Sequence, residues 1–166
     1  MPGLFSNTSP RWLIDKLEIE LQALRTKPTD SMVAFNFFVT AETFVDWLLP
    51  GNSNRTARKT LRAQEILLQV VSHIASDAKH FHAEAAHHNT VQSTEKTGGL
   101  FSGRLFSGKL FIGKQFSKGE IFVNLIGAAA MKYGEKISSL RLAELVFERL
   151  IYLANPPLDA AQQSAP

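Results

Sequence analysis

The spacing of apolar residues predicts a helix near each end of the chain. Ser9 and Pro10 can serve as N-cap and first-turn proline of a helix that stops at Lys27-Pro28. Its apolar residues recur at helical spacing and are Trp12, Leu13, Leu17, Leu21 and Leu24. A last helix can begin at Ser138 or Ser139 and end before Asn155.

Two further helices are predicted between these. Asp30 and Ser31 can cap a helix through Leu49 that is apolar nearly all round, and such a helix is expected at the buried centre of a bundle. After a polar loop at Gly51–Asn54, a basic stretch leads into a third helix that ends near residues 87–89. The apolar side of this third helix is lined by Leu67, Val71, Ile74, Ala78, Phe81 and Ala85.

A five-residue repeat follows the third helix. It places phenylalanines at 101, 106, 111 and 116, and neither a helix nor a strand would bring all four to one face. We expect turns at its glycines. Residues 121–126 then predict a strand, which residues 110–116 or 128–133 could pair with to form a small sheet.

These elements predict an α+β domain, predominantly α: a bundle of four main helices with a small β element between helices three and four. At 166 residues the chain can bury a core of its own. We expect a single domain over residues 1–157, with the Phe/Gly pentad linker and strand at 99–126 and a disordered tail at 158–166.

Composition narrows the class of protein. With no cysteine, disulfides and thiolate zinc sites are excluded, and a reducing compartment, by default the cytoplasm, is expected. We expect no secretory signal and no membrane span, because the start lacks a basic-then-apolar pattern and the apolar runs are short and interrupted. The net charge of +3 permits contact with anions, although ordinary solvated faces are the commoner cause.

Histidine and acidic side chains form a stripe on the third predicted helix. His73, Asp77, His80 and Glu84, together with His87, lie within about 80° of one another on a helical wheel. Imidazole and carboxylate at these spacings can converge on one ion, so the first four residues are candidate ligands of a divalent transition metal. No other cofactor is expected.

Two carboxylates stand out on the second predicted helix, which is otherwise apolar. Burying Glu42 and Asp46 without partners would cost several kcal/mol. Three interpretations compete: a structural contact with Lys79 or His80, the metal site, or acid–base chemistry on a phosphoester or RNA. Glu42, Asp46, Lys79 and His80 are therefore the catalytic candidates.

Two segments carry a family resemblance. Residues 37–42, Phe-Phe-Val-Thr-Ala-Glu, precede the pair Asp46-Trp47, and residues 73–81 read His-Ile-Ala-Ser-Asp-Ala-Lys-His-Phe. Together they resemble a group of small uncharacterised bacterial and phage helical proteins with a DW pair on one helix and an AKHF run on the next. This resemblance implies no particular activity.

The helical part also resembles HEPN domains, helical bundles that include RNases and toxin or antitoxin-like partners. HEPN nucleases carry an arginine shortly before the histidine of one helix. Here residues 73–76, which precede His80, contain no arginine. The resemblance therefore implies a binding member of that class more readily than a nuclease.

The pentad segment suggests a nucleic-acid interface. Its phenylalanines could stack on single-stranded bases while Arg104, Lys109 and Lys114 follow phosphates. The alternative is that the phenylalanines cover the core while the cations face water, which is the usual arrangement. Salt-sensitive binding would distinguish the two.

We expect a non-enzymatic interaction module of bacterial or phage type. Its predicted partner is another protein or a second copy of the chain. The alternatives are a metal- or His-dependent hydrolase and a nucleic-acid-binding protein.

Overall fold

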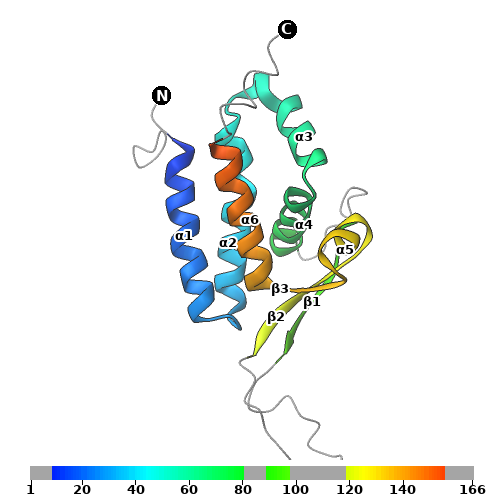
Figure 1. Cartoon of the computed structure of the whole chain (residues 1–166). Coiled ribbons are helices and arrows are strands. Elements are labelled where there is room, and N and C mark those ends of the chain that lie inside the picture. Colours follow the sequence, from blue (N-terminus) through cyan, green and yellow to red (C-terminus); the bar gives the residue numbers. More distant parts are fainter. Residues whose placement is uncertain (1–8, 81–88, 98–118, 156–166) are drawn as a thin grey trace, which may run out of the picture.

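The computed structural model describes residues 9–80, 89–97 and 119–155, without the side chains of residues 78–80 and 97 (Figure 1). Its α-helices in these ranges are α1 (Pro10–Thr26), α2 (Ser31–Leu48), α3 (Arg55–Gln64), α4 (Ile66–His80), α5 (Gly127–Tyr133) and α6 (Ser139–Ala154). The strands are β1 (Val91–Thr97), β2 (Glu120–Leu125) and β3 (Lys136–Ser138), and a 3-10 turn spans Asn52–Asn54. The predicted class, predominantly α with a small sheet, is confirmed.

Three helices begin where their caps predicted. The Ser9 side chain accepts a hydrogen bond from the N–H of Arg11, and Pro10 opens α1. In α2 the carboxylate of Asp30 accepts from the N–H of Met32 at 3.0 Å, and in α6 Ser138 caps in the same way. Each cap satisfies an N–H that has no partner within its helix.

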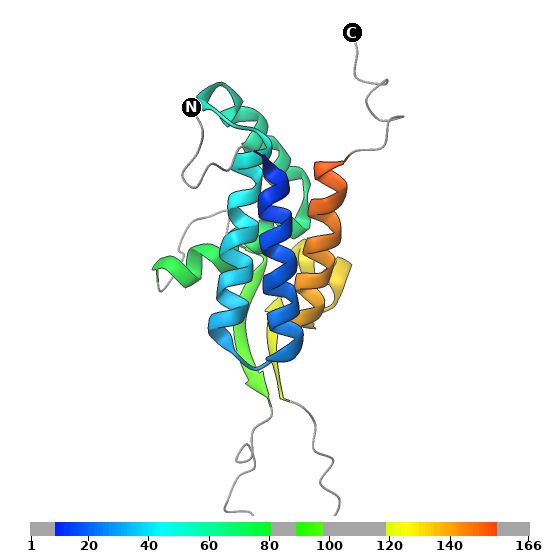
Figure 2. The same cartoon turned by 90° about the vertical axis from the view of Figure 1, so that its left-hand side faces the viewer.

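The main core lies where α1, α2 and α6 pack side by side (Figures 1 and 2). The largest side chains with no exposed surface in these helices are Leu17, Leu24, Phe37, Phe44, Leu142 and Leu150. The prediction that the second helix is central is therefore confirmed on its inner side. Its other face exposes Met32, Asn36 and Asp46, so the helix is not buried all round.

The basic stretch that leads into the predicted third helix is a helix of its own. This helix is α3, and α4 follows after a break at Glu65, whose backbone is extended at φ −106° and ψ 104°. Arg149 of α6 contacts the Glu65 carboxylate through two nitrogens, and this hydrogen bonding raises the pKa of Arg149. No local sequence pattern predicts this break, because the partner of Glu65 lies 84 residues away.

The sheet is antiparallel, in the order β1-β2-β3. Strand β2 matches the predicted strand, and its alternate residues Ile121, Val123 and Leu125 are buried. The expected partner at 128–133 is wrong: this alanine-rich segment forms α5, in keeping with the high helix propensity of alanine. The structure pairs β2 with β1 and β3 instead, and residues 110–116 lie outside the described ranges.

The pentad segment connects two neighbouring strands. Thr97 lies opposite Glu120 in the β1–β2 register, so residues 98–119 join the two strands of a hairpin. The turns predicted at the glycines fall outside the described ranges, and so does the predicted tail at 158–166.

No single helix within the described ranges is long and apolar enough to cross a membrane. Helices α2 and α3 pass this test only when taken together, and they are bent by 106° at the break between them.

Candidate functional site: a pocket between α2, α4 and the sheet

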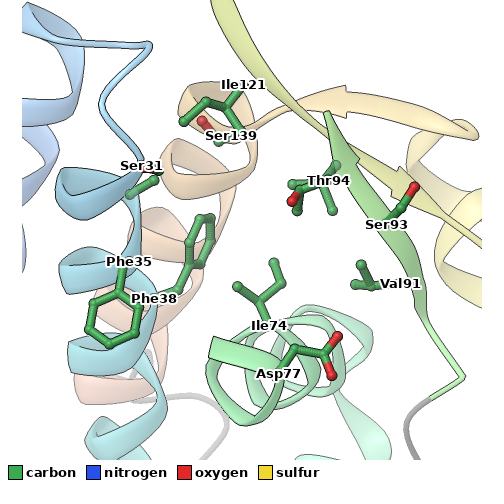
Figure 3. Close-up of a pocket in the computed structure, with 12 residues that line it drawn as sticks. Ser31, Phe35, Phe38, Ile74, Asp77, Val91, Ser93, Thr94, Ile121 and Ser139 are labelled. Atoms are coloured by element: carbon green, nitrogen blue, oxygen red, sulfur yellow. The ribbon is translucent and has the colours of Figure 1, made fainter. Parts of the chain in front are cut away.

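A pocket of about 310 Å³ lies between α2, α4, β1, β2 and the first residue of α6 (Figure 3). Its apolar lining residues are Ala34, Phe35, Phe38, Ile74, Val91, Ile121 and Val123. Its polar lining residues are Ser31, Asp77, Ser93, Thr94 and Ser139. The volume is at the small end of the range that ligand pockets occupy.

The polar and apolar residues of this pocket differ in depth. Phe38 and Val123 are almost fully buried, whereas Ser31, Ser93 and Thr94 are exposed. The pocket therefore has an apolar floor and a rim of hydroxyl groups. This arrangement is typical of sites that bury an apolar group and orient it through a few polar contacts.

Asp77 brings a negative charge to the pocket. Its side chain is 41% exposed, and it is the one charged residue among the described residues that line the cavity. In Figure 3 it projects from α4 beside Ile74, on the side that faces Val91 of β1. Asp77 Oδ2 lies 3.5 Å from His73 Nε2, one helical turn earlier.

His73 links α4 to β1 beneath Asp77. Its ring is buried, and Nδ1 accepts a hydrogen bond from the N–H of Val91 at 3.0 Å, with the Thr90 hydroxyl 3.3 Å away. A nitrogen that accepts carries no proton, so in the neutral ring the proton lies on Nε2 and faces Asp77. His73 thus holds the strand on one side and the carboxylate on the other.

Ser139 contributes a buried hydroxyl to the pocket wall. Its residue is only 2% exposed, and its Oγ has no hydrogen-bond partner in the part of the chain that the structure describes. A buried hydroxyl left unpaired costs about 1–3 kcal/mol. The fold therefore keeps an unfavourable polar group beside a cavity.

The predicted metal ligands are only partly placed. His73 and Asp77 are brought together as the helical spacing predicted. Within the described ranges, no group of three or more His, Asp or Glu residues could hold a metal ion. The side chain of His80 and all of Glu84 lie outside those ranges, so the four-residue site stays a prediction.

The predicted catalytic carboxylates lie on the side of α2 that faces α3. Asp46 Oδ1 is 3.1 Å from Arg58 Nε, and Glu42 Oε1 is 3.2 Å from Arg62 Nε. Arg62 also lies 3.5 Å from Asp46 Oδ2. The side chains of the other two catalytic candidates, Lys79 and His80, are not described, so their expected contacts with these carboxylates stay predictions.

The arginines of α3 also bind backbone groups of α2. Arg58 donates to the carbonyl oxygens of Leu49 and Gly51 at 2.6 and 2.7 Å, and Arg62 donates to that of Glu42 at 3.3 Å. The carbonyls of Leu49 and Gly51 directly follow the end of α2, so Arg58 fastens that end to α3, whereas Arg62 contacts a carbonyl within the helix. Of the four basic residues in this stretch, Arg55, Arg58, Lys59 and Arg62, Arg58 and Arg62 are thus engaged in contacts within the protein.

Sequence reasoning found part of the pocket and missed the rest. It singled out His73 and Asp77, but neither the rim hydroxyls of Ser93 and Thr94 nor the hydroxyl of Ser139. From the sequence, Ser138 and Ser139 are both candidate caps of the last helix, and in the structure Ser138 is the cap. No local pattern marks these residues, because strands and helices far apart in the chain bring them together.

Arg104, Lys109 and Lys114, the predicted nucleic-acid contacts, lie outside the described ranges.

Comparisons of the whole chain with protein-family models, with curated proteins and with solved structures find no match.

Proposed function

We propose that the protein is a non-enzymatic interaction module whose binding site is the pocket between α2, α4 and the sheet. The observation that carries this proposal is the composition of the cavity: an apolar floor, a rim of hydroxyl groups and one carboxylate. Such a site can hold a partner's apolar group and orient it without a second acid or base.

The placement of the carboxylates supports binding over hydrolysis. A hydrolase built on the predicted residues would join Glu42, Asp46 and Asp77 around one cavity. Glu42 and Asp46 instead pair with arginines of α3 and are not among the lining residues. A general acid or base must lie within hydrogen-bond reach of the bound group, and neither of these carboxylates borders the cavity.

A fragment screen followed by methyl NMR tests this function. We expect small apolar fragments to shift the methyl resonances of Ile74, Ile121 and Val123 and to be recovered unchanged. In Ala34→Leu the added side chain occupies the pocket, so the shifts should disappear. Ala57→Leu, on the exposed side of α3, is the matched control and should keep them.

Three results would contradict the proposal. Chemical conversion of a fragment would favour the hydrolase alternative, as would one metal per chain in elemental analysis that is lost in His80→Ala and Asp46→Ala. Fragments that bind equally well to Ala34→Leu would place the binding site elsewhere.

The nucleic-acid alternative stays a prediction with its own test. Binding of single-stranded nucleic acid should weaken with salt and with replacement of Arg104, Lys109 and Lys114 by alanine. Binding that is insensitive to both would exclude it.

A further inference from the structure

We propose that the pocket binds a small organic cation: an amine attached to an apolar body of about one aromatic ring, with a hydrogen-bonding group at the far end. This inference rests on the proposed function, because it names the ligand class of the same pocket. It depends on three features of the cavity, which are its charge, its floor and its unpartnered hydroxyl.

The charge of the pocket selects for a cation. Asp77 is the charged residue among the described lining residues, and the other polar groups there are hydroxyls, of which that of Ser93 already accepts a hydrogen bond from Asn124 at 3.0 Å. A carboxylate offers about four acceptor sites, so Asp77 can bind a ligand and keep its contact with His73. An anionic ligand would meet repulsion with no cation in the described lining to offset it.

The floor selects for an apolar body. Phe38 and Val123 are at most 2% exposed and Ile121 is 8% exposed. Figure 3 shows the Phe38 ring and Ile74 projecting into the space between α2 and α4. A cavity of about 310 Å³ has room for one ring and a short chain, but not for a large ligand.

Ser139 supplies the third feature. Its Oγ lacks a partner among the described residues, and Figure 3 places the residue on the Ile121 side of the pocket, away from Asp77. A ligand with a hydroxyl at the end opposite its amine would satisfy this group. The cost of leaving the hydroxyl unpaired would then be recovered on binding.

The test compares three probes of nearly equal shape in the full-length protein. They are 2-phenylethylamine, the neutral 2-phenylethanol and the anionic 3-phenylpropionate, each titrated while the methyl resonances of Ile74 and Val123 are followed. We expect the amine to bind about fivefold more tightly than the alcohol, because a charge-assisted hydrogen bond adds about that much. The anion should bind least.

Variants then assign the preference to one carboxylate. In Asp77→Asn the amine should bind no more tightly than the alcohol, whose own affinity should not change. Asp15→Asn removes an exposed carboxylate of α1, which pairs with Arg11, and should leave all three affinities as they are. The comparison of probes in the unaltered protein needs no variant to fold.

The possible failures are distinguishable. Equal binding of amine and alcohol, or tighter binding of the anion, would overturn the cation inference while the pocket remained a binding site. No methyl shift with any of the three probes would overturn this inference, and the fragment screen would then decide the proposed function separately.

A fourth probe tests the contact with Ser139. Tyramine carries a ring hydroxyl opposite its amine, and we expect it to bind several-fold more tightly than 2-phenylethylamine. This advantage should disappear in Ser139→Ala. Equal affinities of the two amines for the unaltered protein would remove Ser139, and with it the far hydrogen-bonding group, from the proposed ligand contacts.

Discussion

The two sides of α2 differ in how the polar groups beside them are paired. Toward α3, the carboxylates of Glu42 and Asp46 meet Arg58 and Arg62, and the same arginines bind backbone carbonyls. Toward α4 and the sheet, α2 borders a cavity whose wall includes the Ser139 hydroxyl, which has no hydrogen-bond partner among the residues that the structure describes. The carboxylates of α2 are therefore paired with arginines on its α3 side, whereas the carboxylate that borders the cavity, Asp77, belongs to α4.

The largest loss of stability is expected from replacing Arg62, which lies beside the carboxylates of both Glu42 and Asp46. Arg62→Met should destabilise the protein by about 2–3 kcal/mol, because Glu42 would lose a partner in a half-buried position. Urea unfolding measures this. Affinity for 2-phenylethylamine should stay unchanged, and a parallel loss of affinity would show that the two sides are not independent.

The next largest loss of stability is expected at the hydrogen bond between His73 of α4 and Val91 of β1. His73→Leu removes the acceptor of the Val91 N–H in a buried position, so it should cost about 2 kcal/mol. Hydrogen exchange at Val91 should accelerate more than exchange at Val123. If exchange of the Val91 amide stayed slow, His73 would not be what fastens β1 to α4.

A smaller effect of opposite sign is expected at the pocket wall. Ser139→Ala removes a buried hydroxyl that lacks a partner in the described ranges, so the free protein should gain about 1 kcal/mol of stability. Thermal unfolding of this variant beside Ser138→Ala, which loses the α6 cap and should be destabilised by about 1 kcal/mol, makes a matched pair. Destabilisation of both would mean that Ser139 has a structural role.

The smallest effect is expected at an exposed ion pair. Arg11 and Asp15 lie one turn apart on α1 with side chains 71% and 56% exposed. Asp15→Asn should change stability by less than about 0.5 kcal/mol, since solvent screens such pairs. A change as large as that of Arg62→Met would show that exposure is a poor guide to the role of a carboxylate in this protein.

Local chemistry decided which parts of the fold could be predicted. Ser9, Asp30 and Ser138 act within a few residues of themselves, so the helix starts they mark were predictable. The break at Glu65 depends on Arg149, and β1 depends on pairing with β2, so both required contacts between distant segments.

The same division applies to the site. The proximity of His73 and Asp77 follows from their spacing on one helix, and the structure confirms it. The need of Glu42 and Asp46 for cationic partners was also predictable, but their pairing with Arg58 and Arg62 required knowing that the basic stretch folds as α3. The place of Ser139 in the pocket wall could not be predicted, because its surroundings there come from α2 and β2, which are distant in sequence.

The most direct test of whether Asp77 binds a cation in the pocket is one pair of titrations with 2-phenylethylamine, into Asp77→Asn and into Asp46→Asn. Each variant neutralises one carboxylate, Asp77 on α4 or Asp46 on the neighbouring helix α2. Of these two residues, only Asp77 lines the pocket. We expect about a fivefold loss of affinity in Asp77→Asn and none in Asp46→Asn. Equal losses, or a loss in Asp46→Asn alone, would contradict this expectation.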